Sequence, residues 1–258
     1  MKTSSALIGL TAVLALPALA DEARIADYTA KLRNVRVTEL SRETAKLVTS
    51  KHADAADAVT AAVKLSAPSA PAVSSAVAKA APESAAAAAG AAVKLQPKQA
   101  GAIAKGGVSA APTELEAIVI AMCKAQPTSF YNIGIGAASA APKSGDKVLS
   151  AITTALPALK PLVARSQAQF AAAKRTPSLA MLLKHTGDLL AALSRQTKES
   201  PEALLAQADS AVEVKYAALD KAAPVQLPPF VPGGGTPGEV SAADSAQANP
   251  ADRVYSTP

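Results

Sequence analysis

Few residues of the chain have the type and spacing that catalysis or metal binding requires. His185 and Asp188 are three positions apart on one predicted helix and could share a metal ion. A protein metal site needs three or four ligands, however, and the sequence indicates no others beside this pair. His52 stands in a charged segment, and the single cysteine, Cys123, has no evident histidine partner to activate it. We therefore expect that the protein binds no metal or cofactor and is not an enzyme. The alternative is an enzyme of unknown class with its site around His185.

A glycine-containing segment resembles a phosphate-binding pattern only in part. Residues 134–139 begin as Gly-Ile-Gly, but Ser139 takes the place of the third glycine of G-x-G-x-x-G. That motif works when it follows a strand and opens a helix, so that backbone N–H groups surround the phosphates. Here the segment falls inside a predicted helix with no strand before it. The sequence therefore does not favour a nucleotide site.

Positive charge gathers between residues 160 and 198, where the only acidic residue is Asp188. The next segment, residues 199–221, is acidic. One interpretation is that an acidic helix packs beside the basic segment and neutralises it. The other is that a basic surface stays exposed and binds an anionic envelope polymer or surface. The candidate interaction residues of this segment are Lys160, Arg165, Lys174, Arg175, Lys184, Arg195 and Lys198.

Phe130 and Tyr131 are the one adjacent aromatic pair in a chain with few aromatic residues. They stand where the neighbouring repeats carry alanine, leucine or polar residues. Two roles are open for this pair. The rings can fill a gap against the helices that follow the repeat, or they can form an exposed anchor for a partner such as another envelope protein.

The elements that must position these residues are set by regularly spaced prolines. The spacing is constant from Pro82 to Pro157, and the gap from Pro68 to Pro82 is one position shorter. In blocks numbered to end on proline, positions 6 and 10 are mostly apolar, which places them on one helix face. To keep that register we assign the short block a one-residue deletion. The prolines are Pro68, Pro82, Pro97, Pro112, Pro127, Pro142 and Pro157.

The pattern predicts an all-α fold of short alanine-rich helices, because alanine is the best helix former and proline ends each helix. Echoes between alternate blocks, such as Lys94–Pro97 and Lys124–Pro127, favour a helical hairpin as the unit of an α-solenoid-like array. Glycines inside the helices favour close approach of neighbouring backbones over simple drift of the sequence. A bundle of the same helices remains an alternative to the solenoid.

Five segments follow from this pattern. Residues 1–20 have the basic, apolar and small-residue parts of a signal peptide, so we expect export after cleavage behind Ala20, to the periplasm, the cell envelope or the outside. Residues 21–53 form a helical cap, 54–157 the repeat, and 158–223 longer helices, among them one from Pro201 to Ala223. Residues 224–258 are rich in proline and glycine, which predicts disorder. The sequence thus favours a non-catalytic exported scaffold or binding protein with no transmembrane segment after cleavage.

Overall fold

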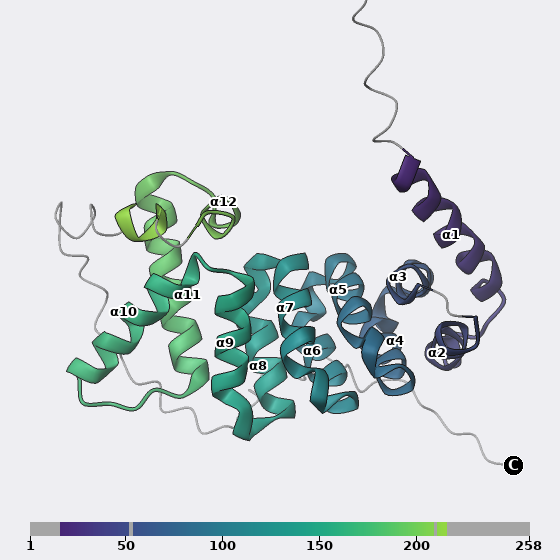
Figure 1. Cartoon of the computed structure of the whole chain (residues 1–258), viewed down its shortest axis with the longest axis horizontal. Helices are drawn as coiled ribbons and strands as arrows, with labels where there is room; N and C mark the ends of the chain where they lie inside the picture. Colours follow the sequence, from purple (N-terminus) through teal and green to yellow (C-terminus); the bar gives the residue numbers. More distant parts are fainter. Residues whose placement is uncertain (1–15, 52–53, 209–210, 216–258) are drawn as a thin grey trace, which may run out of the picture.

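The computed structural model describes residues 16–51, 54–208 and 211–215, and every regular element of these residues is a helix. The helices form an elongated array with α1 and α2 at one end and α10 to α12 at the other (Figure 1). This confirms the predicted all-α fold. The helices are α1 (Leu16–Leu32), α2 (Leu40–Lys51), α3 (Ala55–Leu65), α4 (Ala70–Ala80), α5 (Ala85–Leu95), α6 (Ala100–Ala110), α7 (Leu115–Ala125), α8 (Phe130–Ala140), α9 (Gly145–Ala155), α10 (Leu159–Ala172), α11 (Leu179–Thr197) and α12 (Pro201–Leu205).

The repeats from α3 to α8 share one local design. An α-helix is followed by one non-helical residue and then by a short 3-10 helix that carries the proline. Gln96, for example, leaves helical geometry at φ −130° and ψ 65°, and its N–H still donates to the carbonyl of Ala92. Pro97 follows, and it disfavours helical geometry in the residue before it. The 3-10 helices are η1 (Ala67–Ser69), η2 (Pro82–Ser84), η3 (Pro97–Gln99), η4 (Pro112–Glu114), η5 (Pro127–Ser129) and η6 (Pro142–Ser144).

The predicted one-residue deletion is wrong. The α-helices from α3 to α9 begin at one constant interval, from Ala55 to Gly145. Pro68 is the second residue of its 3-10 helix, whereas Pro82 is the first residue of the next one. Both places suit proline, because the first N–H groups of a helix have no partner inside it. The shorter gap between these prolines therefore reflects a shifted proline and not a shorter repeat.

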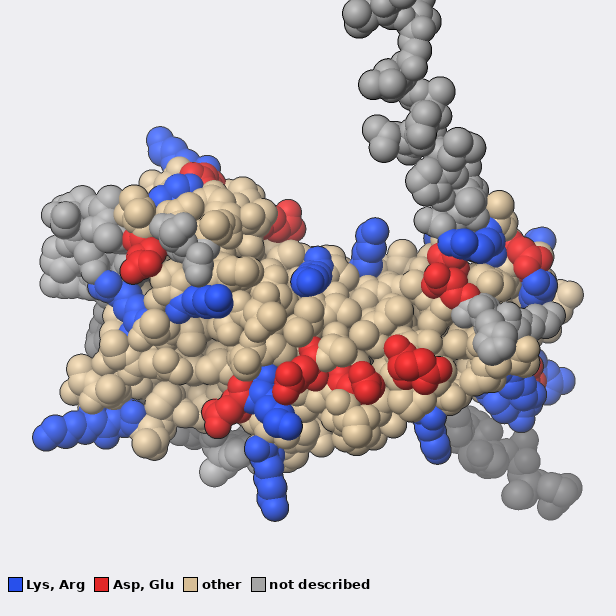
Figure 2. All heavy atoms as spheres, viewed as in Figure 1, with Lys and Arg blue, Asp and Glu red and all other residues tan. Residues whose placement is uncertain are grey.

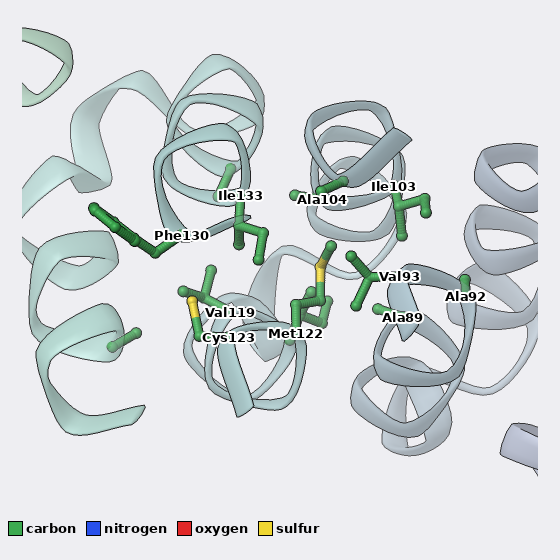
Figure 3. Close-up of a cluster of buried hydrophobic side chains, with 14 of the residues drawn as sticks. Ala89, Ala92, Val93, Ile103, Ala104, Val119, Met122, Cys123, Phe130 and Ile133 are labelled. Atoms are coloured by element: carbon green, nitrogen blue, oxygen red, sulfur yellow. The ribbon is translucent and has the colours of Figure 1, made fainter. Parts of the chain in front are cut away.

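The buried face of the helices from α4 to α7 consists of their positions 1, 4, 5, 8 and 9. Positions 4 and 8 correspond to the two apolar positions that the sequence predicts, and the other three extend the stripe. In α7 the buried residues are Leu115, Ile118, Val119, Met122 and Cys123. In α5 they are Ala85, Ala88, Ala89, Ala92 and Val93. Side chains from both helices meet those of α6 and α8 in one apolar interior (Figure 3).

The helices lie in two layers, because each one packs on the second helix along the chain. Helix α5 packs between α3 and α7 in one layer, and α6 packs between α4 and α8 in the other. The predicted helical hairpin is therefore the structural unit, and the array is a solenoid. Helix α3 is seen end on in Figure 1 whereas α9 lies across the view, so the layers twist along the array.

Glycine allows two helices of one layer to touch through their backbones, as the sequence predicts. A Cβ atom added at Gly136 in α8 would overlap the carbonyl group of Gly101 in α6. A Cβ atom at Gly101 would in turn lie 3.2 Å from the carbonyl oxygen of Asn132. A side chain at Gly136 therefore cannot be accommodated unless one of the backbones moves.

The array is closed at both ends by helices of different composition. At the first end, α1 packs on α3, and Arg24 Nε donates to Asp57 at 2.9 Å. Cleavage behind Ala20 would remove the first residues of α1 but keep this ion pair. At the other end, α11 packs against both α8 and α10.

The helix expected from Pro201 to Ala223 is shorter than predicted, because α12 ends at Leu205. Residues 211–215 are helical again. The break allows Glu199, Gln207 and Lys215 to form a local polar cluster, which a single straight helix would not bring together. The predicted disordered tail lies outside the described residues, as does most of the predicted signal peptide.

Candidate functional site

A buried polar cluster joins α10 to α11. The Ser166 hydroxyl donates to the carbonyl of Leu162 at 2.9 Å and lies 3.0 Å from Nδ1 of His185. It also lies 3.2 Å from the Thr186 hydroxyl, which donates to the Leu182 carbonyl. The ring of Phe170 meets the His185 ring edge-on, with ring centres 5.5 Å apart. Sequence reasoning missed this cluster because its members come from two helices.

A serine beside a histidine is the arrangement of a nucleophile and its base, but this serine is out of reach. Ser166 and Thr186 are both fully buried. Burial also lowers the pKa of His185, while the nearby Asp188 raises it. A serine nucleophile must contact the substrate carbonyl directly, which Ser166 cannot do here. The cluster therefore satisfies polar groups between two helices.

Cys123 is equally inaccessible. Its side chain lies within the apolar interior near Val119 (Figure 3). Burial raises the pKa of the thiol to about 12, so the reactive thiolate is scarce at neutral pH. This placement agrees with a small hydrophobic residue of the core.

The remaining sequence motifs do not form sites either. Gly134 and Gly136 lie within α8 and pack inward, so their backbones face other helices. Among the residues that the structure describes, no three histidine, cysteine or acidic side chains are close enough to hold a metal ion. His52 lies outside the described ranges.

The aromatic pair is divided between the interior and the surface. Phe130 is the first residue of α8 and is buried, and a Cβ atom on Gly187 of α11 would lie 3.8 Å from its ring. Tyr131 points away and is 37% exposed. Phe130 is thus not an accessible anchor, because it fills the joint between the repeat and α11. Of this pair, Tyr131 alone can meet a partner.

The basic candidates lie on α10, α11 and the residues that end these helices. All but Arg165 are exposed, and Arg165 is half-buried. Lys174 and Lys198 have positive φ values of 51° and 57° where α10 and α11 end. A residue with positive φ ends a helix, and a basic side chain there complements the negative end of the helix dipole.

One acid of the acidic segment, Glu199, is paired within that segment. Lys215 Nζ donates to the Glu199 carboxylate at 2.6 Å, and Gln207 donates to it as well. These bonds lower the pKa of Glu199. Glu199 therefore uses a lysine of its own segment in place of a base from α10 or α11.

A shallow depression separates α9 from α10 and α11. It consists of two adjoining grooves of about 360 and 440 Å³ that share Asp146, Leu149 and Gln167. Lys160 lines one groove and Arg175 lines the other. Both grooves mix one acidic side chain with basic, amide and apolar ones, and neither includes the His185 cluster.

The two ends of the repeat helices differ in charge, because acids lie at one end only, where Lys79, Lys143 and Lys147 accompany them. Lys64, Lys94 and Lys124 occupy the tenth position of α3, α5 and α7. Acidic side chains gather at the other end of these helices and form a row across the face seen in Figure 2. Lys94 is echoed by Lys124 two blocks later in the sequence. The spacing alone does not identify the two lysines as one edge, because that requires the layer of each helix.

No protein-family model, no curated protein and no solved structure matches this chain. None of the helices that the structure describes has the combined length and apolar character needed to cross a membrane.

Proposed function

We propose that the protein is a non-catalytic scaffold or binding protein that works through the surface of its helical repeat. The observation that carries this proposal is the repeated interior, in which the same five helix positions are buried from α4 to α7. The buried positions serve packing, so the residues that can contact a partner are those on the exposed ends and faces of the helices. Solenoids of this kind bind partners along extended surfaces.

The polar groups of the described chain support binding in preference to catalysis. The serine and histidine that come together are held between helices, and the thiol is buried in the core. Export behind Ala20 and a place in the cell envelope or outside the cell belong to the same proposal, because residues 1–20 have the pattern of a signal peptide. Another envelope protein or an anionic polymer is the proposed kind of partner.

A substitution at His185 tests the absence of catalysis. In the protein's own host, a strain lacking the gene is complemented with the wild-type chain or with His185→Gln, which keeps a polar side chain of similar size. We expect equal complementation and equal amounts of cross-linked partner, because the ring holds α10 and α11 together through Ser166 and Phe170 and takes part in no reaction. Loss of complementation by a variant with an unchanged circular dichroism spectrum would instead support an enzyme.

A second candidate function is a basic adaptor that uses residues 160–198. It is favoured by the hydrogen bonds of Glu199, whose carboxylate accepts from Lys215 and Gln207 and from no basic residue of α10 or α11 that the structure describes. Lys184, Arg195 and Lys198 are exposed on or just after α11 and have the turn spacing that places them on one side of it. An anionic polymer or headgroup surface would meet this side.

Charge reversal tests this second candidate. Binding of the chain to an anionic resin should weaken when these three residues are changed to glutamate and should fall with added salt. Lys79→Glu/Lys105→Glu/Lys147→Glu is a control with the same change in net charge on the repeat. Binding that does not depend on salt, or equal losses in both variants, would contradict the adaptor.

A further inference from the structure

A row of lysines runs along one edge of the repeat. We define the lysine edge as Lys64, Lys94 and Lys124, which follow one another in alternate repeats. All three are exposed, and Lys98 in η3 adds a further base beside them. Figure 2 shows single basic side chains standing at the upper edge of the molecule above α5 and α7.

Helix dipoles alone do not account for this row. A lysine near the C-terminal end of any helix is favoured by the dipole, in either layer. The tenth positions of α4, α6 and α8 hold Lys79, Ser109 and Ser139. Lysine is thus repeated in the layer of α3, α5 and α7 and not in the other layer. The row therefore belongs to one side of the array.

Within the described repeat, acidic residues lie away from the lysine edge. Helices α4, α6 and α8 begin at this edge, and none has an acidic side chain in its first turn. The acids of residues 54–157 all lie at the beginning of α3, α5, α7 and α9, at the opposite ends of the helices. They are Asp54, Asp57, Glu83, Glu114, Glu116 and Asp146.

The two rows are too far apart to neutralise each other. A repeat helix is about 16 Å long, and exposed charges are largely screened beyond about 8 Å at physiological salt. Within the described residues, none of the three lysines of the edge forms an ion pair. Their charges therefore remain directed at solvent or at a ligand.

The edge also continues past the first repeat. Lys64 and Arg33 line a groove of about 470 Å³ against α1, which includes one acid, Glu22. A ligand along the edge would thus meet a hollow at the end nearest α1, with two basic side chains in its wall.

The geometry of the row decides the kind of ligand. Neighbouring helices of one layer lie about 8–10 Å apart, so the lysines are separate point charges and do not form a pocket for one small anion. Because the array twists, a rigid partner could not contact all three lysines at once, whereas a flexible chain can contact each of them. Tyr131 is the one exposed ring of residues 54–157, so the edge has no row of aromatic side chains for stacking with nucleic-acid bases.

We infer that the lysine edge binds a flexible linear polyanion, whose anionic groups lie across the ends of α3, α5 and α7. The inference rests on the proposed binding function and names the ligand class of this surface. Polymers of phosphate groups and polycarboxylates share the necessary chemistry. The surface is distinct from the basic segment of α10 and α11.

Binding of long-chain polyphosphate to the full chain is the main test, with polygalacturonate as the carboxylate polymer and inorganic phosphate as the single anion. We expect both polymers or one of them to bind and inorganic phosphate not to bind measurably. Lys64→Glu/Lys94→Glu/Lys124→Glu should weaken polymer binding roughly tenfold or more, since exposed charges contribute about twofold to fivefold each. The dependence of log Kd on log salt should become shallower by about two.

The matched control is Lys79→Glu/Lys105→Glu/Lys147→Glu, which changes net charge equally but lies off the edge. Equal losses in the two variants would show that net charge alone attracts the polymer and would overturn the inference. Absence of polymer binding by the wild-type chain would overturn it too, while partners cross-linked to the repeat in the host would still support the proposed function. Salt-sensitive self-association that the lysine variant abolishes would overturn the inference as well. The lysine edge of one copy would then bind the acidic row of a second copy and not a polymer.

Discussion

The repeat and the C-terminal helices fill their interfaces in opposite ways. In the repeat, α6 and α8 meet through glycine backbones, and α5 is buried through alanines and one valine. Helices α10 and α11 meet through leucines and Phe170, with the hydroxyls of Ser166 and Thr186 enclosed between them.

The difference shows that one chain can use two kinds of constraint. Packing through small residues fixes the distance between backbones, so any added atom is costly. Packing through large residues tolerates small changes of shape but requires each enclosed polar group to keep a partner. Four experiments separate these constraints, beginning with the largest expected effect.

Thiol labelling should distinguish the interior of the repeat from the surface of α11. Burial raises the pKa of Cys123 to about 12, so at pH 8 its thiolate is about a thousandfold rarer than in a free cysteine. We expect a correspondingly slow reaction with a disulfide reagent in the folded chain. Ala191→Cys in a Cys123→Ser background places the thiol on the exposed side of α11 and should react at the rate of a free thiol. Fast labelling of native Cys123 would show that the repeat opens.

Gly136→Ala should destabilise the repeat by about 3 kcal/mol, because the new Cβ atom overlaps the backbone of Gly101. Chemical denaturation followed by circular dichroism measures this change. Gly145→Ala is the matched control. A Cβ atom there meets nothing within 4 Å, so the same substitution should be neutral or stabilise by up to about 1 kcal/mol. Similar midpoints for the two variants would disprove the backbone contact.

Ser166→Ala should cost about 1 to 2 kcal/mol, because it leaves Nδ1 of His185 and the Thr186 hydroxyl without their shared partner. Denaturation should show this loss, and the exchange of α11 amide hydrogens should become faster than that of α5. Ser139→Ala on the exposed side of α8 removes a hydroxyl that bonds only to its own helix and serves as the control. Equal effects would mean that the cluster does not stabilise the joint.

The smallest expected effect is the contribution of His185 to the pH dependence of stability. Its pKa is lowered in the folded chain by burial, against an ordinary value of 6.5. The unfolded chain therefore binds the proton more tightly than the folded chain. The contribution of His185 to the free energy of unfolding is thus complete above pH 6.5 and is lost as pH falls below it. The lowered pKa values of Glu43 and Glu199 act below 4.5, outside this window. His185→Gln should reduce the loss of stability between pH 7.5 and pH 5, and an unchanged loss would contradict this assignment.

The sequence predicts the helices of the repeat and their two layers well. Proline marks the end of each helix, and the segments repeated in alternate blocks mark the alternation of the layers. It predicts two of the five buried positions. The other three hold alanine in several repeats, as Ala85 and Ala89 do in α5, and alanine is also common outside the buried stripe. The register error at Pro68 has a related cause, since proline marks the turn and not the start of the α-helix.

The candidate surfaces are less predictable than the fold. The approach of Ser166 to His185 depends on the packing of α10 against α11, which no short-range pattern specifies. The bonding of Glu199 depends on the helix break after Leu205. The lysine edge is present in the sequence as a spacing, but the separation of Lys94 from Glu83 by the length of α5 becomes meaningful only when all odd-numbered helices of the repeat share one layer.

The stacking of each helix on its second neighbour restricts how this chain can change in length. Inserting a single repeat block would move every later helix to the other layer, so Lys124 would leave the lysine edge and α11 would lose its place beside α8. Inserting a pair of blocks would restore every later helix to its own layer. The array therefore has a parity, and viable length variants are expected to differ by whole helical hairpins.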